Sequence, residues 1–357
     1  MPLTVLCYSI FISFAFADGP QDNIPEKVRP IPPAGINVAA ADQDELEGGL
    51  TTLGKEIDSL RGALKGKPLQ ALLPDVQIYH KAVHYALHYG EFFSSNQIGI
   101  AKQFIKQGIE RAQLLREGKA PWTQTNGLIV RGYLSRVDGS VQPYGLVIPP
   151  SYQANSAHQY RLDFWFHGRG ETLSELDFIN GRQRSAGEFT PPNTFVLHLY
   201  GRYCNGNRFA GETDLFEALE NVRKYYPIDE NRLVVRGFSL GGAACWHMAT
   251  HHASLWAAAA PGAGFSETAD FLKVFQRETL KPTWYEQKLW HMYDSTDYAV
   301  NLFDCPTVAY SGEQDSQKQA ADMMVKAAAA EGMELTHIIG PKTKHAYEPE
   351  AKKEVNR

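Results

Sequence analysis

A serine lies between two glycines in the stretch Leu233-Val-Val-Arg-Gly-Phe-Ser-Leu-Gly-Gly, which runs from an apolar segment into a series of small residues. The spacing Gly237-x-Ser239-x-Gly241 is typical of a strained turn between a strand and a helix. Such a turn raises the serine hydroxyl above the sheet edge, and a side chain at either glycine would collide with a neighbouring strand or helix. The pattern predicts that Ser239 is a nucleophile rather than only a helix cap.

A serine hydroxyl is inert near neutral pH unless a base takes its proton and an acid orients that base. Asp315 lies three residues past Gly312, in a turn after an apolar segment, with Glu313 as the alternative acid. His345 lies in the loop that follows the next apolar segment, whereas His337 lies inside that segment. We therefore predict that Asp315 orients His345 and that His345 is the base.

Acyl transfer also needs hydrogen-bond donors for the oxyanion that develops on the substrate. The residue after the nucleophile, Leu240, offers one backbone N–H group. A second donor is expected in His167-Gly-Arg-Gly170, a glycine-rich loop after an apolar segment. The predicted donor there is the amide of Arg169, with Gly168 as the alternative.

Four stretches together resemble the α/β-hydrolase superfamily and, within it, the prolyl-oligopeptidase-family serine hydrolases of secreted bacterial type. They are His167-Gly-Arg-Gly, Arg236-Gly-Phe-Ser-Leu-Gly-Gly-Ala-Ala-Cys-Trp246, Tyr310-Ser-Gly-Glu-Gln-Asp315 and Gly340-Pro-Lys-Thr-Lys-His345. The last three stretches contain Ser239, Asp315 and His345, in the chain order serine, acid, histidine that this superfamily uses. The resemblance spans about residues 125–350 and implies a serine hydrolase that forms an acyl-enzyme and needs no cofactor.

The resemblance leaves two classes of substrate open. The family name favours peptide bonds, so a serine-type peptidase is the first expectation. Prolyl oligopeptidases have a Tyr as oxyanion donor where this chain has Arg169, and they carry a β-propeller, whose repeats this sequence lacks. Both differences favour esters, and the stretch ending at Trp246 is equally similar to secreted carboxylesterases of the feruloyl-esterase and polyester-depolymerase kind. A non-catalytic binding protein on a hydrolase fold is the alternative outside enzymes.

From residue 121 onward, strand-like apolar segments alternate with helix-like segments. The expected strands are residues 128–135, 144–148, 160–166, 194–200, 233–236, 256–260, 307–310 and 335–339, and the expected helices are residues 212–225, 240–251 and 316–331. Asp138-Gly139 predicts a hairpin between the first two strands. The alternation predicts an α/β fold with an eight-stranded, mostly parallel sheet, as an α/β-hydrolase fold requires.

Three segments precede this predicted catalytic domain of residues 121–357. Residues 1–17 are uncharged and end in a small-x-small site, which predicts a signal peptide and a secreted or periplasmic protein. Residues 18–41 contain five prolines and predict an extended linker. Leucine and isoleucine at alternating steps of four and three predict a helical stripe at residues 46–64. Further helices are expected at residues 69–89 and 96–117, so residues 42–120 form a predicted helical module.

An aromatic-rich insert, residues 262–305, lies between two expected strands. In this fold such a connection lies over the active site, so its aromatic side chains are expected either to form an apolar substrate pocket or to pack a cap onto the sheet. We name Trp284 and Tyr285 of the insert, and Tyr203 after an earlier strand, as candidate substrate-binding residues for a small-molecule ester or peptide.

Composition excludes several other functions. The chain has 357 residues and a formal net charge of −5, with no concentrated Lys/Arg segment, so nucleic acid is not an expected partner. No membrane association is expected after signal cleavage. Cys204, Cys245 and Cys305 remain after cleavage and allow at most one disulfide. His80, His84 and His88 share one helix face. Zinc sites in proteins usually include a ligand from another helix, strand or loop, so no metal site is predicted here.

Overall fold

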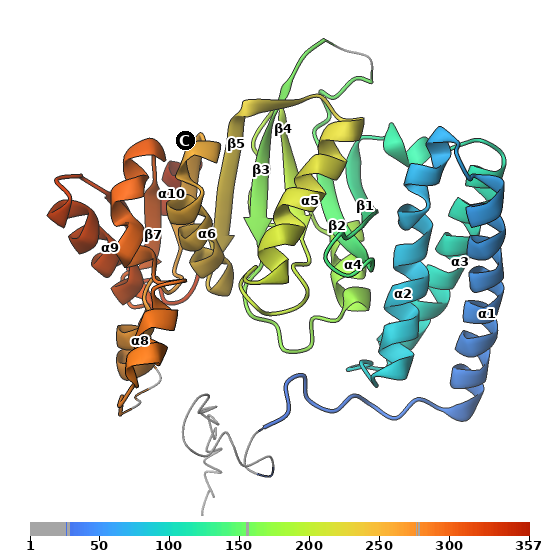
Figure 1. The fold of residues 1–357 in the computed structure, drawn as a ribbon, viewed down its shortest axis with the longest axis horizontal. Helices are drawn as coiled ribbons and strands as arrows, with labels where there is room; N and C mark the ends of the chain where they lie inside the picture. The colour runs from blue at the N-terminus through green and yellow to red at the C-terminus, as the bar shows by residue number, and fades with distance from the viewer. Residues whose placement is uncertain (1–25, 27–28, 155–156, 276, 278) are drawn as a thin grey trace, which may run out of the picture.

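The computed structural model describes residues 26, 29–154, 157–275, 277 and 279–357. Its centre is one eight-stranded sheet with the order β1-β2-β4-β3-β5-β6-β7-β8 (Figure 1). The strands are β1 (Gly127–Leu134), β2 (Val141–Ile148), β3 (Tyr160–Phe166), β4 (Thr194–Leu199), β5 (Ile228–Phe238), β6 (Ala258–Gly262), β7 (Val308–Gly312) and β8 (Thr336–Gly340). All eight expected strands are present, and the predicted fold class is confirmed.

The directions of the strands decide where functional loops can meet. β1 and β2 form the predicted antiparallel hairpin, and β2 is also antiparallel to β4. From β4 across to β8, every neighbouring pair is parallel. The carboxyl ends of β3 to β8 therefore lie along one edge of the sheet, and the loops that follow these strands are neighbours.

Helices cover both faces of the sheet. They are α4 (Glu175–Arg184), α5 (Ala210–Tyr225), α6 (Leu240–His251), α9 (Lys318–Ala330) and α10 (Pro349–Val355). In β3, Phe164 and Phe166 join the core that contains α6, whereas Trp165 joins a second cluster with Val355 of α10. Because successive strand residues point to opposite faces, α6 and α10 lie on opposite sides of the sheet. The sequence analysis did not predict α4 or α10.

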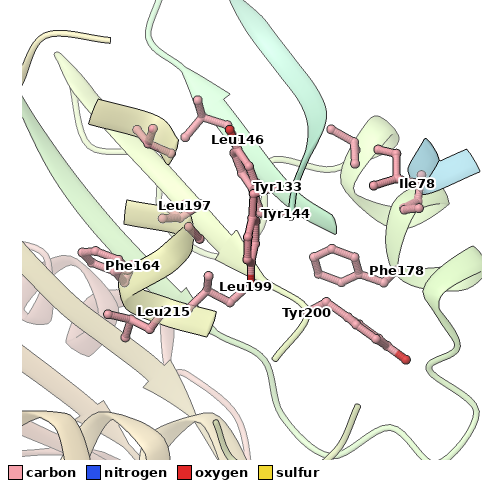
Figure 2. Close-up of a cluster of buried hydrophobic side chains, with 14 of the residues drawn as sticks. Ile78, Tyr133, Tyr144, Leu146, Phe164, Phe178, Leu197, Leu199, Tyr200 and Leu215 are labelled. Atoms are coloured by element: carbon pink, nitrogen blue, oxygen red, sulfur yellow. The ribbon is translucent and has the colours of Figure 1, made fainter. Parts of the chain in front are cut away.

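Aromatic and leucine side chains fill the core between the strands and helices, as Figure 2 shows. Tyr133 of β1 and Tyr144 of β2 stand side by side, with ring centroids 6.3 Å apart. The Tyr144 hydroxyl donates to Asn221 of α5, and Phe178 of α4 packs on Tyr200. Burial of this apolar surface, at about 25 cal/mol per Å², attaches the helices to the strands that carry the site.

The predicted helical module is present as α1 (Ala40–Ala63), α2 (Pro74–His88) and α3 (Asn96–Arg116), drawn in blue to teal beyond β1 in Figure 1. The predicted stripe of α1 is buried throughout. The helix expected over residues 69–89 is instead a short 3₁₀ turn, η2 (Pro68–Leu72), followed by α2. Pro74 explains the break, because proline has no N–H group to continue a helix but is suited to its first position.

A buried ion pair joins this module to the sheet. Asp75 of α2 accepts hydrogen bonds from Arg131 Nη2 of β1 at 2.9 Å, from the Gly132 amide at 2.8 Å and from Trp122 Nε1 at 2.9 Å. Both charged side chains are fully buried. The module is therefore packed against the β1–β2 end of the sheet, away from the carboxyl ends of β5, β7 and β8.

Short elements complete the described chain. They are η3 (Pro121–Thr123), η4 (Ala253–Leu255), α7 (Thr268–Asp270), η5 (Phe271–Phe275), α8 (Trp284–Trp290) and η6 (Ser295–Asp304). The predicted signal peptide at residues 1–17 lies outside the described residues, as does part of the predicted linker. Residues 29–39 of the linker contain no helix or strand, whereas residues 40 and 41 already belong to α1. Within the described residues, no helix has the length and apolar character needed to cross a membrane. Cys204, Cys245 and Cys305 are free thiols, and Cys245 is buried in α6.

Candidate active site

Ser239 occupies the sharp turn between β5 and α6. Its backbone angles are φ 59° and ψ −124°, a conformation that a residue with a side chain rarely adopts and that is concentrated at functional sites. The flanking glycines make the turn possible. A Cβ on Gly241 would lie 2.0 Å from the carbonyl oxygen of Phe166, and one on Gly237 would lie 2.1 Å from that of Gly241. The steric reason for the glycine spacing is therefore confirmed.

His345 and Asp315 are hydrogen-bonded to each other. His345 Nδ1 lies 2.7 Å from Asp315 Oδ2, and the other carboxylate oxygen accepts the Gln317 amide at 2.9 Å. The Asp315 side chain is 2% exposed and that of His345 is 40% exposed. Because a carboxylate only accepts hydrogen bonds, Nδ1 of His345 carries the proton, and Nε2 of the neutral ring keeps its lone pair for a substrate or nucleophile.

The alternative acid and base have other partners. Glu313 is exposed and accepts the amide of Lys342 at 2.6 Å. His337 lies within β8, with its Nδ1 3.5 Å from Asp322 of α9, and burial lowers its pKa. Of the described acids that the sequence analysis weighed, Asp315 is the one that contacts His345.

Contacts across the edge bring these loops towards Ser239. Phe238, the residue before Ser239, has its ring centroid 4.9 Å from that of His345. On the other side, a Cβ placed on Gly168 would lie 3.5 Å from the Cβ of Ser239. The loops after β3, β5 and β8 therefore meet at one place on the carboxyl edge.

The two expected oxyanion donors lie at the start of α6 and in the loop after β3. Leu240 is the first residue of α6, where an amide has no acceptor within the helix and the helix dipole favours negative charge. The loop of residues 167–170 is held in place by the His167 ring, whose nitrogens lie 2.8 Å from the Gly168 carbonyl oxygen and 2.9 Å from that of Tyr200. Cys204 Sγ accepts the Gly170 amide at 3.0 Å.

The Arg169 side chain turns to the surface and binds Glu171 at 2.8 Å. Arg29, from the segment before α1, binds the same carboxylate at 2.6 Å. The hydrogen bond from Arg29, together with the charge of Arg169, lowers the pKa of Glu171 to about 2. The N-terminal segment is thus anchored beside the loop that carries Gly168, a contact that the sequence analysis did not predict.

The three candidate substrate-binding residues are not gathered at one place. Tyr203 donates its hydroxyl hydrogen bond to the Glu171 carbonyl oxygen and is half-buried. Trp284 and Tyr285 are exposed on α8, 72% and 52% respectively, and contact each other with ring centroids 5.8 Å apart. None of these three lines the cavity beside His345.

That cavity has a volume of about 1020 Å³ and opens next to the paired histidine. Its walls at the carboxyl edge are His167, Gly168, Phe238 and His345. It continues over the face of the sheet that α10 covers, where Arg182 of α4 contributes a charged side chain. The sequence analysis did not identify Arg182, because α4 itself was not predicted.

The residues described by the model include no group of His, Cys, Asp and Glu suited to hold a metal ion. The rings of His80, His84 and His88 stack on one another, with centroids 6.0 and 5.7 Å apart. Burial, together with the neighbouring His84, lowers the pKa of His80.

The strand order, the turn after β5 and the acid and histidine after β7 and β8 define an α/β-hydrolase fold. Residues 206–357, which include β5 to β8 and the loops that follow them, match the model of the prolyl oligopeptidase family. The predicted resemblance to the prolyl oligopeptidase family is confirmed for these residues, and the match supports a serine hydrolase. No curated protein matches the chain.

Solved structures of hydrolases are similar to this chain. One is FphF, a fluorophosphonate-binding serine hydrolase of Staphylococcus aureus, with 15% identity over 65% of this chain and 98% of its own, and a TM-score of 0.49. A ferulic acid esterase shares 14% identity over 64% and 95% of the two chains, with a TM-score of 0.47. Pyrococcus horikoshii acylaminoacyl peptidase shares 13% identity over 65% of this chain and 40% of its own, with a TM-score of 0.47. The chain thus aligns with less than half of the peptidase.

Proposed function

We propose that this protein hydrolyses acyl bonds through an acyl-enzyme on Ser239. The observation that carries the proposal is the hydrogen bond between His345 and the buried Asp315, at the sheet edge where the strained turn presents Ser239. A paired histidine with a free Nε2 is the base that a serine needs. The exposure of His345 leaves that nitrogen accessible to a substrate.

In the proposed reaction, Ser239 Oγ attacks the acyl carbon while His345 Nε2 takes the hydroxyl proton. The amides of Leu240 and of Arg169 or Gly168 bind the oxygen that becomes negative, each contributing about 3 kcal/mol. His345 then gives its proton to the leaving alcohol or amine, and water releases the acyl group by the same steps. Asp315 stabilises the imidazolium that forms in between, and the reaction needs no cofactor.

The substrate is a small peptide or ester, and we propose that the protein acts outside the cytoplasm after removal of residues 1–17. The family match favours a peptidase. The carboxylesterase alternative is favoured by the loop after β3, where Arg169 is turned away to Glu171 and provides no hydroxyl donor like that of prolyl oligopeptidases.

Three measurements on the mature protein test the proposal. A fluorophosphonate probe should label wild type, and Ser239→Ala should abolish labelling and reduce turnover by at least about 10⁴-fold with unchanged circular dichroism. Comparison of p-nitrophenyl acyl esters with peptide p-nitroanilides separates esterase from peptidase. Unchanged hydrolysis in Ser239→Ala would refute the assignment. A wild type that neither reacts with the probe nor turns over either substrate would favour the non-catalytic binding protein.

A further inference from the structure

One arginine in the cavity beside His345 has no carboxylate partner among the residues that the structure describes. The stem of Arg182 packs over Gly145 of β2, so closely that a Cβ on this glycine would lie 2.7 Å from Arg182 Cγ. Arg182 lines the same cavity as His345. No carboxylate among the described residues lies within salt-bridge distance of it, and burial lowers the pKa of Arg182 with no opposing charge. Arginine nevertheless remains charged at any pH at which proteins fold.

A neutral histidine holds this guanidinium in place. Arg182 Nη1 lies 3.0 Å from His198 Nδ1, and His198 Nε2 lies 3.1 Å from the Ala186 carbonyl oxygen. Because the carbonyl can only accept, Nε2 carries the proton and Nδ1 accepts from Arg182. Burial, together with the charge of Arg182, lowers the pKa of His198 to about 3, so this ring stays neutral. The contact orients Arg182 without neutralising it.

Two lysines also line the cavity, but each has a carboxylate. Lys352 binds Glu188 at 2.7 Å, and Lys353 binds Glu350 at 2.6 Å. Among the described residues that line the cavity, Glu188 is the one acidic residue. Arg182 is therefore the cavity cation that is left for a ligand, and its guanidinium offers several donors that suit a carboxylate.

We infer that Arg182, positioned by His198, binds a carboxylate of the acyl substrate at a distance from the bond that is cleaved. The inference rests on the proposed function, because it gives that same site a substrate class: esters or peptides with a free carboxylate. The acyl part or the leaving group can carry this charge, since both extend from the carbonyl that reacts with Ser239.

Two matched pairs of esters distinguish these two sources of the charge. The first compares the p-nitrophenyl monoester of suberic acid with the same ester methylated at its free carboxylate. The second compares 4-carboxyphenyl butyrate with 4-carbamoylphenyl butyrate. Wild type should favour the charged member of one pair in kcat/KM by about 10- to 100-fold, the range expected for a hydrogen bond to a charged group. The preference should lie mainly in KM.

In Arg182→Gln, the ratio of kcat/KM for charged and neutral members should fall to near one, and Arg182→Lys should restore part of it. Arg184 is the matched control, because it lies on the same helix, is exposed and does not line the cavity. Arg184→Gln should keep the wild-type ratio. Circular dichroism and fluorophosphonate labelling report whether Arg182→Gln is folded with a reactive serine.

A wild type that hydrolyses the neutral esters but prefers neither charged member overturns the inference and leaves the proposed function intact. The inference also fails if Arg182→Gln keeps the wild-type ratio. If wild type neither reacts with the fluorophosphonate probe nor hydrolyses any ester or peptide tested, the proposed function fails. Calorimetric titration with suberate then tests directly whether Arg182 binds a carboxylate. Suberate binding that is present in wild type and lost in Arg182→Gln supports an anion site at Arg182. The inference is overturned if both proteins bind suberate equally or if wild type does not bind it.

Discussion

Replacement of Asp315 by asparagine tests the proposed base at its hydrogen bond. Both carboxylate oxygens of Asp315 have donors, Gln317 N–H on Oδ1 and His345 Nδ1 on Oδ2. Asparagine has one acceptor, so one donor must face its NH₂ group. If the amide oxygen faces His345, the backbone amide of the half-buried Gln317 is left unpaired at a cost of about 1–3 kcal/mol. The opposite orientation is therefore favoured, and there the NH₂ group donates to Nδ1 of His345.

That orientation moves the ring proton to Nε2, where it blocks acceptance of the Ser239 proton. A penalty of about 1–3 kcal/mol leaves roughly a tenth to a hundredth of the molecules with the active tautomer. Loss of the negative charge beside the imidazolium lowers the rate further, because the Asp315 side chain is 2% exposed and water screens it little. We expect kcat to fall by about 10³- to 10⁴-fold.

Steady-state hydrolysis of a p-nitrophenyl ester measures this loss, with thermal unfolding as the check on structure. Glu313→Gln is the matched control, because Glu313 is exposed and its replacement keeps an acceptor for the Lys342 amide. Its activity should stay within about twofold of wild type, as expected for a surface substitution. Activity of Asp315→Asn within tenfold of wild type, with Glu313→Gln inactive, would refute the reasoning.

Two further predictions concern stability. Asp75→Asn should lower the free energy of unfolding, measured in urea, by about 3–5 kcal/mol, because it leaves Arg131 buried without a counter-ion. The control Asp58→Asn removes an exposed carboxylate and should change the free energy of unfolding by less than about 0.5 kcal/mol. Equal effects of the two substitutions would contradict this account. Burial raises the pKa of Asp294 to about 6, so its cost to folding develops as pH rises from about 4 through 6. Asp294→Asn should therefore raise the unfolding midpoint at pH 8 and leave it nearly unchanged at pH 4, and a lower midpoint at pH 8 would show that the charge stabilises the fold.

The strands could be predicted because their apolar segments are long and clearly bounded. β3 was predicted at the residues where it lies, and α6 likewise. β5 was predicted at residues 233–236 but extends from Ile228 to Phe238. Ile228 pairs with Tyr160 of β3, and the polar residues 229–232 that follow it interrupt the apolar pattern. α4 and α10 were missed because they are short and largely polar, and their stability depends on packing against the sheet rather than on their own sequence.

The predicted acid and histidine meet because chain order and parallel strands suffice to bring their loops together. Asp315 and His345 each follow a strand, and neighbouring parallel strands end at the same edge. The pairing of Arg182 with His198 has no such local signal. It depends on the register of β4 and on how closely α4 approaches Gly145, and neither follows from spacing in the sequence.

The buried and half-buried arginines together show why Arg182 points to a ligand. Burial of a guanidinium costs several kcal/mol unless other groups compensate for it. Arg131 and Arg236 each bind a buried aspartate, and Arg208 lies between two aromatic rings of the insert, 4.9 and 4.5 Å from their centroids. Arg182 has the neutral ring of His198 and an open cavity. Because no described carboxylate balances its charge and the His198 ring is neutral, an anionic substrate beside His345 is the partner that would offset the cost.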